Sequence, residues 1–317
     1  MTNPLISICI PAYLKPDYVV RLLKSVLQQT YKRVEVVISD DSPDDTVKIA
    51  IEPYKSELSI VYIQNRPALK SPANWNNAIR VAKGDFFILL HQDDWLFDAE
   101  ALNKYLKAFN DHPNAGFAFC KNIAVREDGE EIVLQYIPGL LKRLTKTPLH
   151  LVLAQVIGPP SNTMLRTSIR DKVQYDEDLI WLVDVDYYVR VLQAGIDYVY
   201  LDEHLVSIGL HEDQTTVFCR NNSEIILKEN ILFAYKIGEK AFKDLKIYDY
   251  YWRLLRNDAV KSIEQIIASG LFAEKILPLF SHMLNLQNKL PSRVLKFGAS
   301  SKILMFLNYL TRPEKIQ

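Results

Sequence analysis

Paired acids follow two apolar segments in the N-terminal third of this 317-residue chain. Asp93 and Asp94 come shortly after FFILL, and Asp40 and Asp41 follow VEVVIS directly. Carboxylate oxygens are the ligands that Mg²⁺ and Mn²⁺ prefer, and a cation held by them eases the departure of a diphosphate. The second pair suits hydrogen bonds to a base or ribose. Acid pairs are also common in solvated turns, so neither pair alone identifies a site.

Two further groups of polar residues lie in the second half of the chain. Asp184 and Asp186 open a helical pattern, where the helix dipole favours acids in any case. A carboxylate beside an acceptor hydroxyl instead serves as a general base. His211 begins the run HEDQT, and a lone histidine of this kind is a ligand, a phosphate contact or an ordinary surface residue.

The first hundred or so residues alternate apolar runs with helical patterns. We expect strands at 5–10, 34–39, 59–63 and 86–90, and helices at 17–29, 46–54, 71–83 and 98–109. Gly84 is expected to stop the third of these helices. Continuously apolar strands indicate a parallel sheet covered on both faces. Ligands of such sheets bind beyond the carboxyl ends of the strands, where both acid pairs lie.

The pattern changes towards the C-terminus. We expect short strands at 116–120, 161–165 and 198–201 around a helix at 184–194, and then only helical patterns, such as 224–238 and 250–268. The sequence therefore predicts two domains, residues 1–218 and 219–317.

Composition excludes several classes of protein. The 38 basic and 38 acidic residues balance, which argues against a nucleic-acid partner. The three cysteines are far apart, so they indicate neither a metal site nor a disulfide framework, and Cys9 and Cys120 are expected in buried strands. We find no secretory leader pattern and no run of ~18 apolar residues. A cytoplasmic protein is expected.

Six segments, taken together and in order, resemble the inverting glycosyltransferases of family 2, which have the GT-A fold. They lie within residues 4–217 and read SICIPAYLKPDYVVRLLKSVLQQTY, VEVVISDDSPDDT, NWNNAIRVAKGDFFILLHQDDWL, GPPSNTMLR, WLVDVDYYVRVLQAG and IGLHEDQTT. Each segment is a weak signal alone, but six in this order are specific. The resemblance implies an α/β fold, with a Rossmann-like mixed sheet flanked by helices and a C-terminal helical extension.

The resemblance also implies roles for individual residues in a single displacement at the anomeric carbon. Asp184 is the general base, with Asp186 as the runner-up. A divalent cation, Mn²⁺ or Mg²⁺, is held by Asp93 with support from Asp94 and His211. The residues implied to bind the donor are Pro11, Tyr13, Asp41, Asn74, Asn76, Asp93 and Asp94. Those implied to contact the acceptor or the sugar are His91, Trp95, Ser161 and Trp181.

Two positions depart from the family pattern. His91 stands where the family's DxD motif has its first acid, which leaves Asp93 as the principal metal ligand and the role of His91 open. Val183 stands where the base motif usually has glutamate, so the Glu-Asp pair keeps its aspartate and loses its glutamate.

The family's habits suggest the substrates. The expected donor is a UDP-sugar, with dTDP as the second choice of nucleotide. The expected acceptor is a glycan or a lipid-linked glycan in cell-surface polysaccharide synthesis. Two alternatives stay open. A metal-dependent nucleotidyltransferase would usually have a glycine-rich loop near its N-terminus, and SICIPAYLKP has no glycine. An inactive sugar-nucleotide-binding member would not need Asp93, Asp94 and Asp184.

Residues 289–317 form a basic and apolar tail, in which six lysines and arginines face the single acid Glu314. Such a segment is suited to lie peripherally in the headgroup region of the inner membrane leaflet. It equally suits the last helices of a packed domain, or a homo-oligomer interface.

Overall fold

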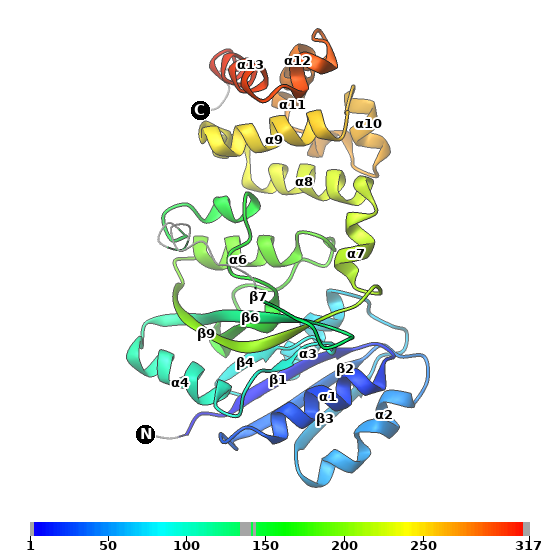
Figure 1. The fold of residues 1–317 in the computed structure, drawn as a ribbon, viewed down its shortest axis with the longest axis vertical. Helices are drawn as coiled ribbons and strands as arrows, with labels where there is room; N and C mark the ends of the chain where they lie inside the picture. Colours follow the sequence, from blue (N-terminus) through cyan, green and yellow to red (C-terminus); the bar gives the residue numbers. More distant parts are fainter. Residues whose placement is uncertain (1–2, 134–140, 142–143, 313–317) are drawn as a thin grey trace. The chain divides into compact units, whose positions relative to one another are not determined.

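The computed structural model describes residues 3–133, 141 and 144–312, and these form two compact units (Figure 1). The first unit comprises Met1–Pro148, Gln155–Asp178 and Val183–Gln214, and the second comprises Leu149–Ala154, Leu179–Leu182 and Thr215–Gln317. The chain therefore leaves the first unit twice before its final exit after Gln214.

One nine-stranded mixed sheet forms the centre of the first unit, as the fold class predicted. Its order is β3-β2-β1-β4-β8-β6-β9-β5, with β7 paired to β6. The strands β3, β2, β1 and β4 run parallel, β8 is antiparallel to both β4 and β6, and β9 runs parallel to β6. The bounds are β1 (Ile6–Ala12), β2 (Val34–Asp40), β3 (Ser59–Gln64), β4 (Phe86–Leu89), β5 (Trp95–Leu96), β6 (Ala115–Arg126), β7 (Glu131–Val133), β8 (Thr163–Arg166) and β9 (Asp197–Leu210).

Helices cover both faces of this sheet, because alternate strand residues point to opposite sides. In β2, Ile38 packs in the apolar cluster that includes Val19 and Leu22 of α1, whereas Ser39 on the other side accepts a hydrogen bond from Asn77 of α3. The helices of this unit are α1 (Pro16–Leu27), α2 (Thr46–Ile51), α3 (Ala73–Val81), α4 (Ala101–Asp111) and α6 (Val183–Gln193).

Strands β6 and β9 are much longer than the short strands expected at 116–120 and 198–201. They have 12 and 14 residues. Polar residues such as Lys121, Asn122 and His204 interrupt their apolar pattern, and register shifts accompany them between Cys120 and Asn122. An irregular strand pair of this kind weakens the alternation of apolar and polar residues by which a strand is recognised in a sequence. Cys9 and Cys120 are buried in β1 and β6, as predicted.

The second unit is helical. Its helices are α7 (Thr215–Arg220), α8 (Ser223–Ile237), α9 (Leu245–Asn257), α10 (Ile263–Ala268), α11 (Pro278–Gln287), α12 (Ser292–Lys296) and α13 (Gly298–Leu310). The single helical pattern expected at 250–268 is wrong: α9 ends at Asn257, Ala259 has a left-handed φ of 52°, and Ser262 begins α10 with a capping box. In the part of the chain that the structure describes, none of the helices meets the length and apolarity that a membrane span requires.

Gly84 does not stop helix α3, which already ends at Val81. Its role is close packing, since an added Cβ would lie 2.6 Å from the Ser7 hydroxyl and 2.8 Å from the carbonyl oxygen of Leu5. The Gly84 N–H donates to Ser7 Oγ, which in turn donates to the buried carboxylate of Glu35. The glycine thus lets the start of β4 approach β1.

We predict that Gly84→Ala lowers the free energy of unfolding by about 1–3 kcal/mol, because backbone atoms of Leu5 and Phe86 cannot move away from the new methyl group. Urea denaturation measures the change. Gly298→Ala is the matched control, since a Cβ there meets no atom within 4 Å. Equal stability of Gly84→Ala and wild type would contradict the packing role.

Candidate active site

The carboxyl ends of β1, β2 and β4 meet at one edge of the sheet, which brings the predicted acids together. The register pairs Ala12 with Asp40, and Cys9 with Leu89. The side chain of Gln92 joins the segment that follows β4 to the segment that follows β1. It accepts from the Tyr13 N–H at 2.9 Å and donates to the Tyr13 carbonyl at 3.1 Å. Pro11 is buried beneath this edge, and the ring of Tyr13 is exposed.

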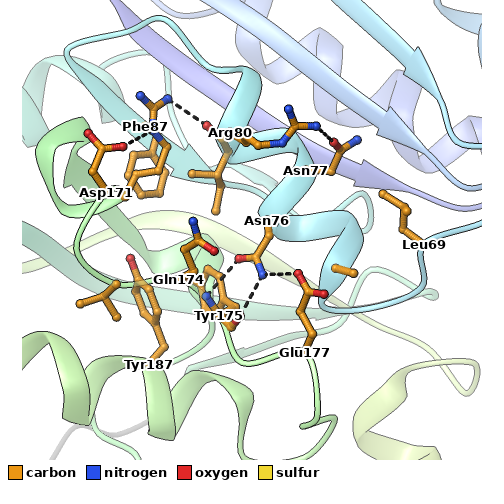
Figure 2. A pocket seen from close by; sticks show the side chains of 14 residues that line it. Leu69, Asn76, Asn77, Arg80, Phe87, Asp171, Gln174, Tyr175, Glu177 and Tyr187 are labelled. Atoms are coloured by element: carbon orange, nitrogen blue, oxygen red, sulfur yellow. Dashed lines mark hydrogen bonds and ion pairs between the residues drawn. The ribbon is translucent and has the colours of Figure 1, made fainter.

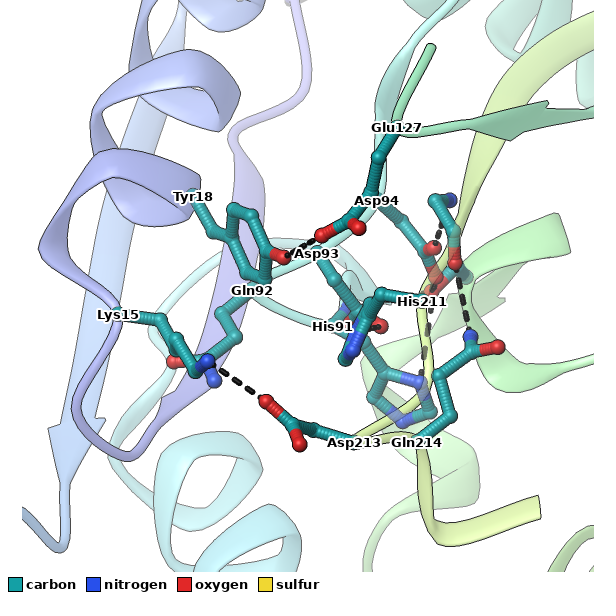
Figure 3. A network of polar contacts seen from close by, with 12 residues as sticks. Lys15, Tyr18, His91, Gln92, Asp93, Asp94, Glu127, His211, Asp213 and Gln214 are labelled. Carbon is teal, nitrogen blue, oxygen red and sulfur yellow. Dashed lines mark hydrogen bonds and ion pairs between the residues drawn. The ribbon is translucent and has the colours of Figure 1, made fainter. Parts of the chain in front are cut away.

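Asp93 is paired with His211, 118 residues further along the chain (Figure 3). The distance from Asp93 Oδ2 to His211 Nε2 is 3.0 Å. Burial acts to raise the pKa of Asp93, but the hydrogen bond from His211 and the nearby ring of His91 bring that pKa below its ordinary value. The carbonyl oxygen of Asp93 accepts from Arg21, whose guanidinium lies over the Trp95 ring at 3.9 Å.

Asp94 is turned into the protein. Its carboxylate is buried and accepts from the Ser161 hydroxyl at 2.5 Å and from the Gly209 N–H at 3.1 Å. Burial, together with the neighbouring charge of Asp93, raises the pKa of Asp94 well above its ordinary value. Gly209 must be glycine here, since a Cβ would lie 2.4 Å from the Asp93 carbonyl oxygen.

His91 packs its ring against Trp75, with centroids 4.7 Å apart, and its backbone N–H donates to Ser161 Oγ. Burial lowers the pKa of His91, so the imidazole is neutral near pH 7. Its Nε2 is buried and has no partner in the structure, and the same holds for Nδ1 of His211. Two unsatisfied imidazole nitrogens beside Asp93 leave polar groups available to a ligand.

The residues at this edge fit a divalent cation of the nucleotide-bound kind. No group of three or more His, Cys, Asp or Glu side chains suited to a metal ion exists among the described residues. A cation that binds with a diphosphate needs fewer, because one or two carboxylates and the phosphate oxygens complete its coordination together with water. Asp93 and His211 are the groups that would hold it, with the unpartnered nitrogens close by.

Asp41 is buried at the end of β2 and accepts three hydrogen bonds. They come from the Leu69 N–H, the Lys70 N–H and the side chain of Asn65. The carboxylate is therefore fixed before any ligand binds, and it shapes the loop after β3. The adjacent Asp40 is committed to Ser42 and Tyr62 and points into the fold.

Asn74 and Asn76 both lie on α3 but have different surroundings. Asn74 is buried, accepts from Asn65 and donates to the Ala12 carbonyl. The amide of Asn76 instead bonds both the N–H and the carbonyl of Tyr175. This contact closes one end of a cavity of about 290 Å³ between α3 and residues 170–177 (Figure 2). Of all the residues singled out from the sequence, Asn76 is the one that lines this cavity, and none of the acids predicted from the sequence to have a role does so.

Asp184 and Asp186 occupy different environments in the first turn of α6. Asp184 is partly open to solvent and accepts from the Gln155 side chain at 3.1 Å. Burial of the carboxyl group raises its pKa to about 6, although hydrogen bonds from Gln155 and the Val185 N–H act to lower it. Asp186 is buried and pairs with Arg190, with both guanidinium contacts at 2.7 Å or less. Of the two residues, Asp184 is the one that keeps some exposure to solvent.

Glu229 of α8 is a functional candidate that the sequence did not reveal, because it reads as one more charge in a helical pattern. Its buried carboxylate accepts from three consecutive N–H groups, those of Ile180, Trp181 and Leu182, at 2.7, 2.7 and 2.9 Å. Burial raises the pKa of Glu229. This carboxylate therefore fixes the backbone of Trp181 and of the residue immediately before α6.

Comparisons with known proteins agree with this geometry. The model of "Glycosyl transferase family 2" matches residues 7–174, which is more than half of the chain. An uncharacterized glycosyltransferase of Methanocaldococcus jannaschii is 24% identical over 283 residues, covering 87% of this chain and 93% of that protein. A β-1,3-glucosyltransferase of Escherichia coli, WfaP, is 33% identical over 100 residues, covering 32% of this chain and 39% of that protein.

Solved structures share the fold. TarS of S. aureus in complex with UDP-GlcNAc superposes with a TM-score of 0.60 at 22% identity, covering 96% of this chain and 89% of that one. The mannosyltransferase PcManGT of Pyrobaculum calidifontis, in complex with GDP-Man and Mn²⁺, gives a TM-score of 0.58 at 14% identity, covering 97% and 87%. With the family match and the strand-end acids, these findings identify the chain as a member of glycosyl transferase family 2, a GT-A glycosyltransferase that acts on nucleotide sugars.

Proposed function

We propose that this enzyme transfers a hexosyl or N-acetylhexosaminyl group from a UDP-sugar to an acceptor hydroxyl, with inversion. The observation that carries the proposal is that the candidate carboxylates differ in position and environment. Asp41 and Asp93 follow the carboxyl ends of β2 and β4, the parallel strands on either side of β1, where nucleotides bind in such sheets, whereas Asp184 is the partly exposed acid whose pKa is raised to about 6.

The proposed reaction is a single displacement. The acceptor oxygen forms a bond to the anomeric carbon while the bond from that carbon to the diphosphate oxygen breaks. Asp184 takes the proton of the attacking hydroxyl, and the nucleoside diphosphate leaves with the bonding electrons. In this proposal Asp41 accepts a hydrogen bond from the base, and Asp93 and His211 would hold the cation. When bound, that Mn²⁺ or Mg²⁺ neutralises charge on the departing diphosphate.

Relatives suggest the acceptor and the setting. The name of WfaP gives its substrate as α-D-GlcNAc-diphosphoundecaprenol, a lipid-linked sugar, and its donor as UDP-Glc. TarS was solved with UDP-GlcNAc. We therefore propose a glycan or lipid-linked glycan acceptor in cell-surface polysaccharide synthesis, with the enzyme at the cytoplasmic face of the membrane.

A thermal-shift panel of UDP-, dTDP- and GDP-sugars, each with Mn²⁺, Mg²⁺ or a chelator, tests the donor. With every ligand at the same concentration, we expect a UDP-sugar with Mn²⁺ or Mg²⁺ to raise the unfolding free energy most. The rise is about 2.7 kcal/mol when that concentration is ~100 times the dissociation constant of the UDP-sugar. A larger shift with a dTDP- or GDP-sugar would reject UDP. Release of UDP on adding acceptor then separates an active enzyme from an inactive binder.

We predict that Asp184→Asn abolishes transfer, leaves donor affinity unchanged and stabilises the protein. The folded-state pKa of about 6 lies above the ordinary value of 3.8, so stability falls as pH rises between these values and stays lower above them. Asparagine cannot ionise, so at about pH 8 the variant should gain about 1–3 kcal/mol. Denaturation at about pH 8 and single-turnover transfer measure the two effects.

The same pKa predicts that transfer by the wild type declines as pH falls through about 6, because the base becomes protonated. Asp186→Asn is the comparison variant. If it loses transfer while Asp184→Asn keeps it, the base is Asp186.

We predict that Asp93→Ala removes the metal dependence of donor binding, since its carboxylate is the group best placed for the cation. Titration of UDP with and without Mn²⁺ checks this. Asp111→Ala, which removes an exposed carboxylate at the end of α4, is the control and should bind like wild type. Unchanged Mn²⁺ dependence in Asp93→Ala would reject the metal assignment.

A further inference from the structure

Helix α13 packs with a polar side towards the core of the helical unit. Its buried residues are Ser301, Met305 and Asn308. The Ser301 hydroxyl accepts from Arg256 at 2.7 Å and from Trp252 at 3.3 Å, and Asn308 accepts from the Tyr248 hydroxyl at 2.7 Å. Hydrogen bonds to α9 thus fix which face of α13 is buried.

The outward side of the same helix is apolar, whereas a surface helix usually buries its apolar side and exposes its polar side. The spacing 303, 306, 307 and 310 places four side chains in one stripe. Ile303, Phe306, Leu307 and Leu310 have 62%, 45%, 51% and 60% of their surface exposed, and Phe297 before the helix has 68%. With Val294, six of the sixteen exposed large apolar side chains of the described residues lie within 294–310. A stripe of this kind marks an interaction surface.

The segment that carries this stripe is also basic, and it contains no acid. Lys289, Arg293, Lys296, Lys302 and Arg312 lie in or beside α12 and α13, and residues 289–312 contain no Asp or Glu. No ion pair involves these five residues among the part of the chain that the structure describes. Glu314 and Lys315, which complete the predicted basic tail, lie outside the described residues.

The positive charge of this segment decides between a second copy of the chain and a lipid bilayer as the partner that covers the apolar stripe. A twofold contact with a second copy would place this patch against itself, and so bring like charges together in a low-dielectric interface. An anionic bilayer instead offers negative headgroups to the basic residues and an acyl boundary to the apolar stripe.

We propose that the α12–α13 surface docks on anionic phospholipid, with Phe297, Ile303, Phe306, Leu307 and Leu310 in the interface and the basic residues at the headgroups. The proposal gives a structural reason for the membrane setting proposed above. Only the use of such docking to the enzyme rests on the proposed function. A surface-bound enzyme meets a lipid-linked acceptor by diffusion in two dimensions.

Vesicle flotation of the full chain tests the docking at low salt, with phosphatidylcholine vesicles that do or do not contain phosphatidylglycerol. We expect wild type to float with the anionic vesicles alone. Ile303→Ser/Leu310→Ser should reduce the floated fraction about tenfold or more, because two side chains no longer transfer from water. Ile49→Ser/Phe272→Ser, which removes side chains that are 70% and 66% exposed elsewhere, should float like wild type.

Three results would overturn the proposal: wild type that stays unbound, equal flotation with neutral vesicles, or a double variant at 303 and 310 that floats undiminished. Light scattering of the same proteins decides the rival, since a mass that halves in the Ile303→Ser/Leu310→Ser variant would assign the face to a second copy. Flotation uses no donor, so its failure leaves the transferase proposal standing. Conversely, an enzyme that floats but binds no UDP-sugar rejects the donor assignment alone.

Discussion

The buried carboxylate of Asp94 imposes the constraint on which the active-site edge depends. A buried carboxylate destabilises the fold unless hydrogen bonds satisfy it. Its two partners, Ser161 and Gly209, come from segments 67 and 115 residues away, and the Ser161 hydroxyl also receives the N–H of His91. One side chain thereby fixes the end of β4, the turn before β8 and the end of β9. Asp93 meets His211 because these three segments cannot separate.

The same edge shows how neighbouring acids acquire different properties. Asp93 faces an imidazole and has a lowered pKa, whereas Asp94 faces the interior and has a raised one. Asp41 is held by two backbone N–H groups and the Asn65 amide. Asp184, which lies apart from this edge on α6, accepts from the Gln155 amide and the Val185 N–H and is partly exposed. Preorganised groups of this kind need little rearrangement when substrates bind, which is where enzymes gain much of their rate.

The sequence predicted those parts of the fold that depend on local pattern. Apolar runs located β1 to β4, and the alternation of strand and helix placed the acids after β2 and β4 at one edge of the sheet, because it sets the direction of the strands. Contacts between distant segments left no such signal. The sequence singled out neither Gly209 nor Gln155, yet Gly209 allows Asp93 to approach β9 and Gln155 donates a hydrogen bond to Asp184. The α13 pattern predicts an apolar face but not whether that face is buried, which Ser301 and Asn308 decide through α9.

The three hydrogen bonds that Glu229 accepts have a consequence for the order in which the chain folds during synthesis. Residues 179–182 belong to the helical unit although they are flanked on both sides by residues of the sheet unit, so the polypeptide passes between the units five times. The ribosome releases Trp181 well before Glu229, and until α8 emerges this stretch has no carboxylate to hold it. The N–H groups of Ile180, Trp181 and Leu182 therefore acquire their acceptor only after synthesis has moved into the C-terminal helices. A fragment cut at residue 218 would lack Glu229 and so leave these three N–H groups without the acceptor that they have in the full chain.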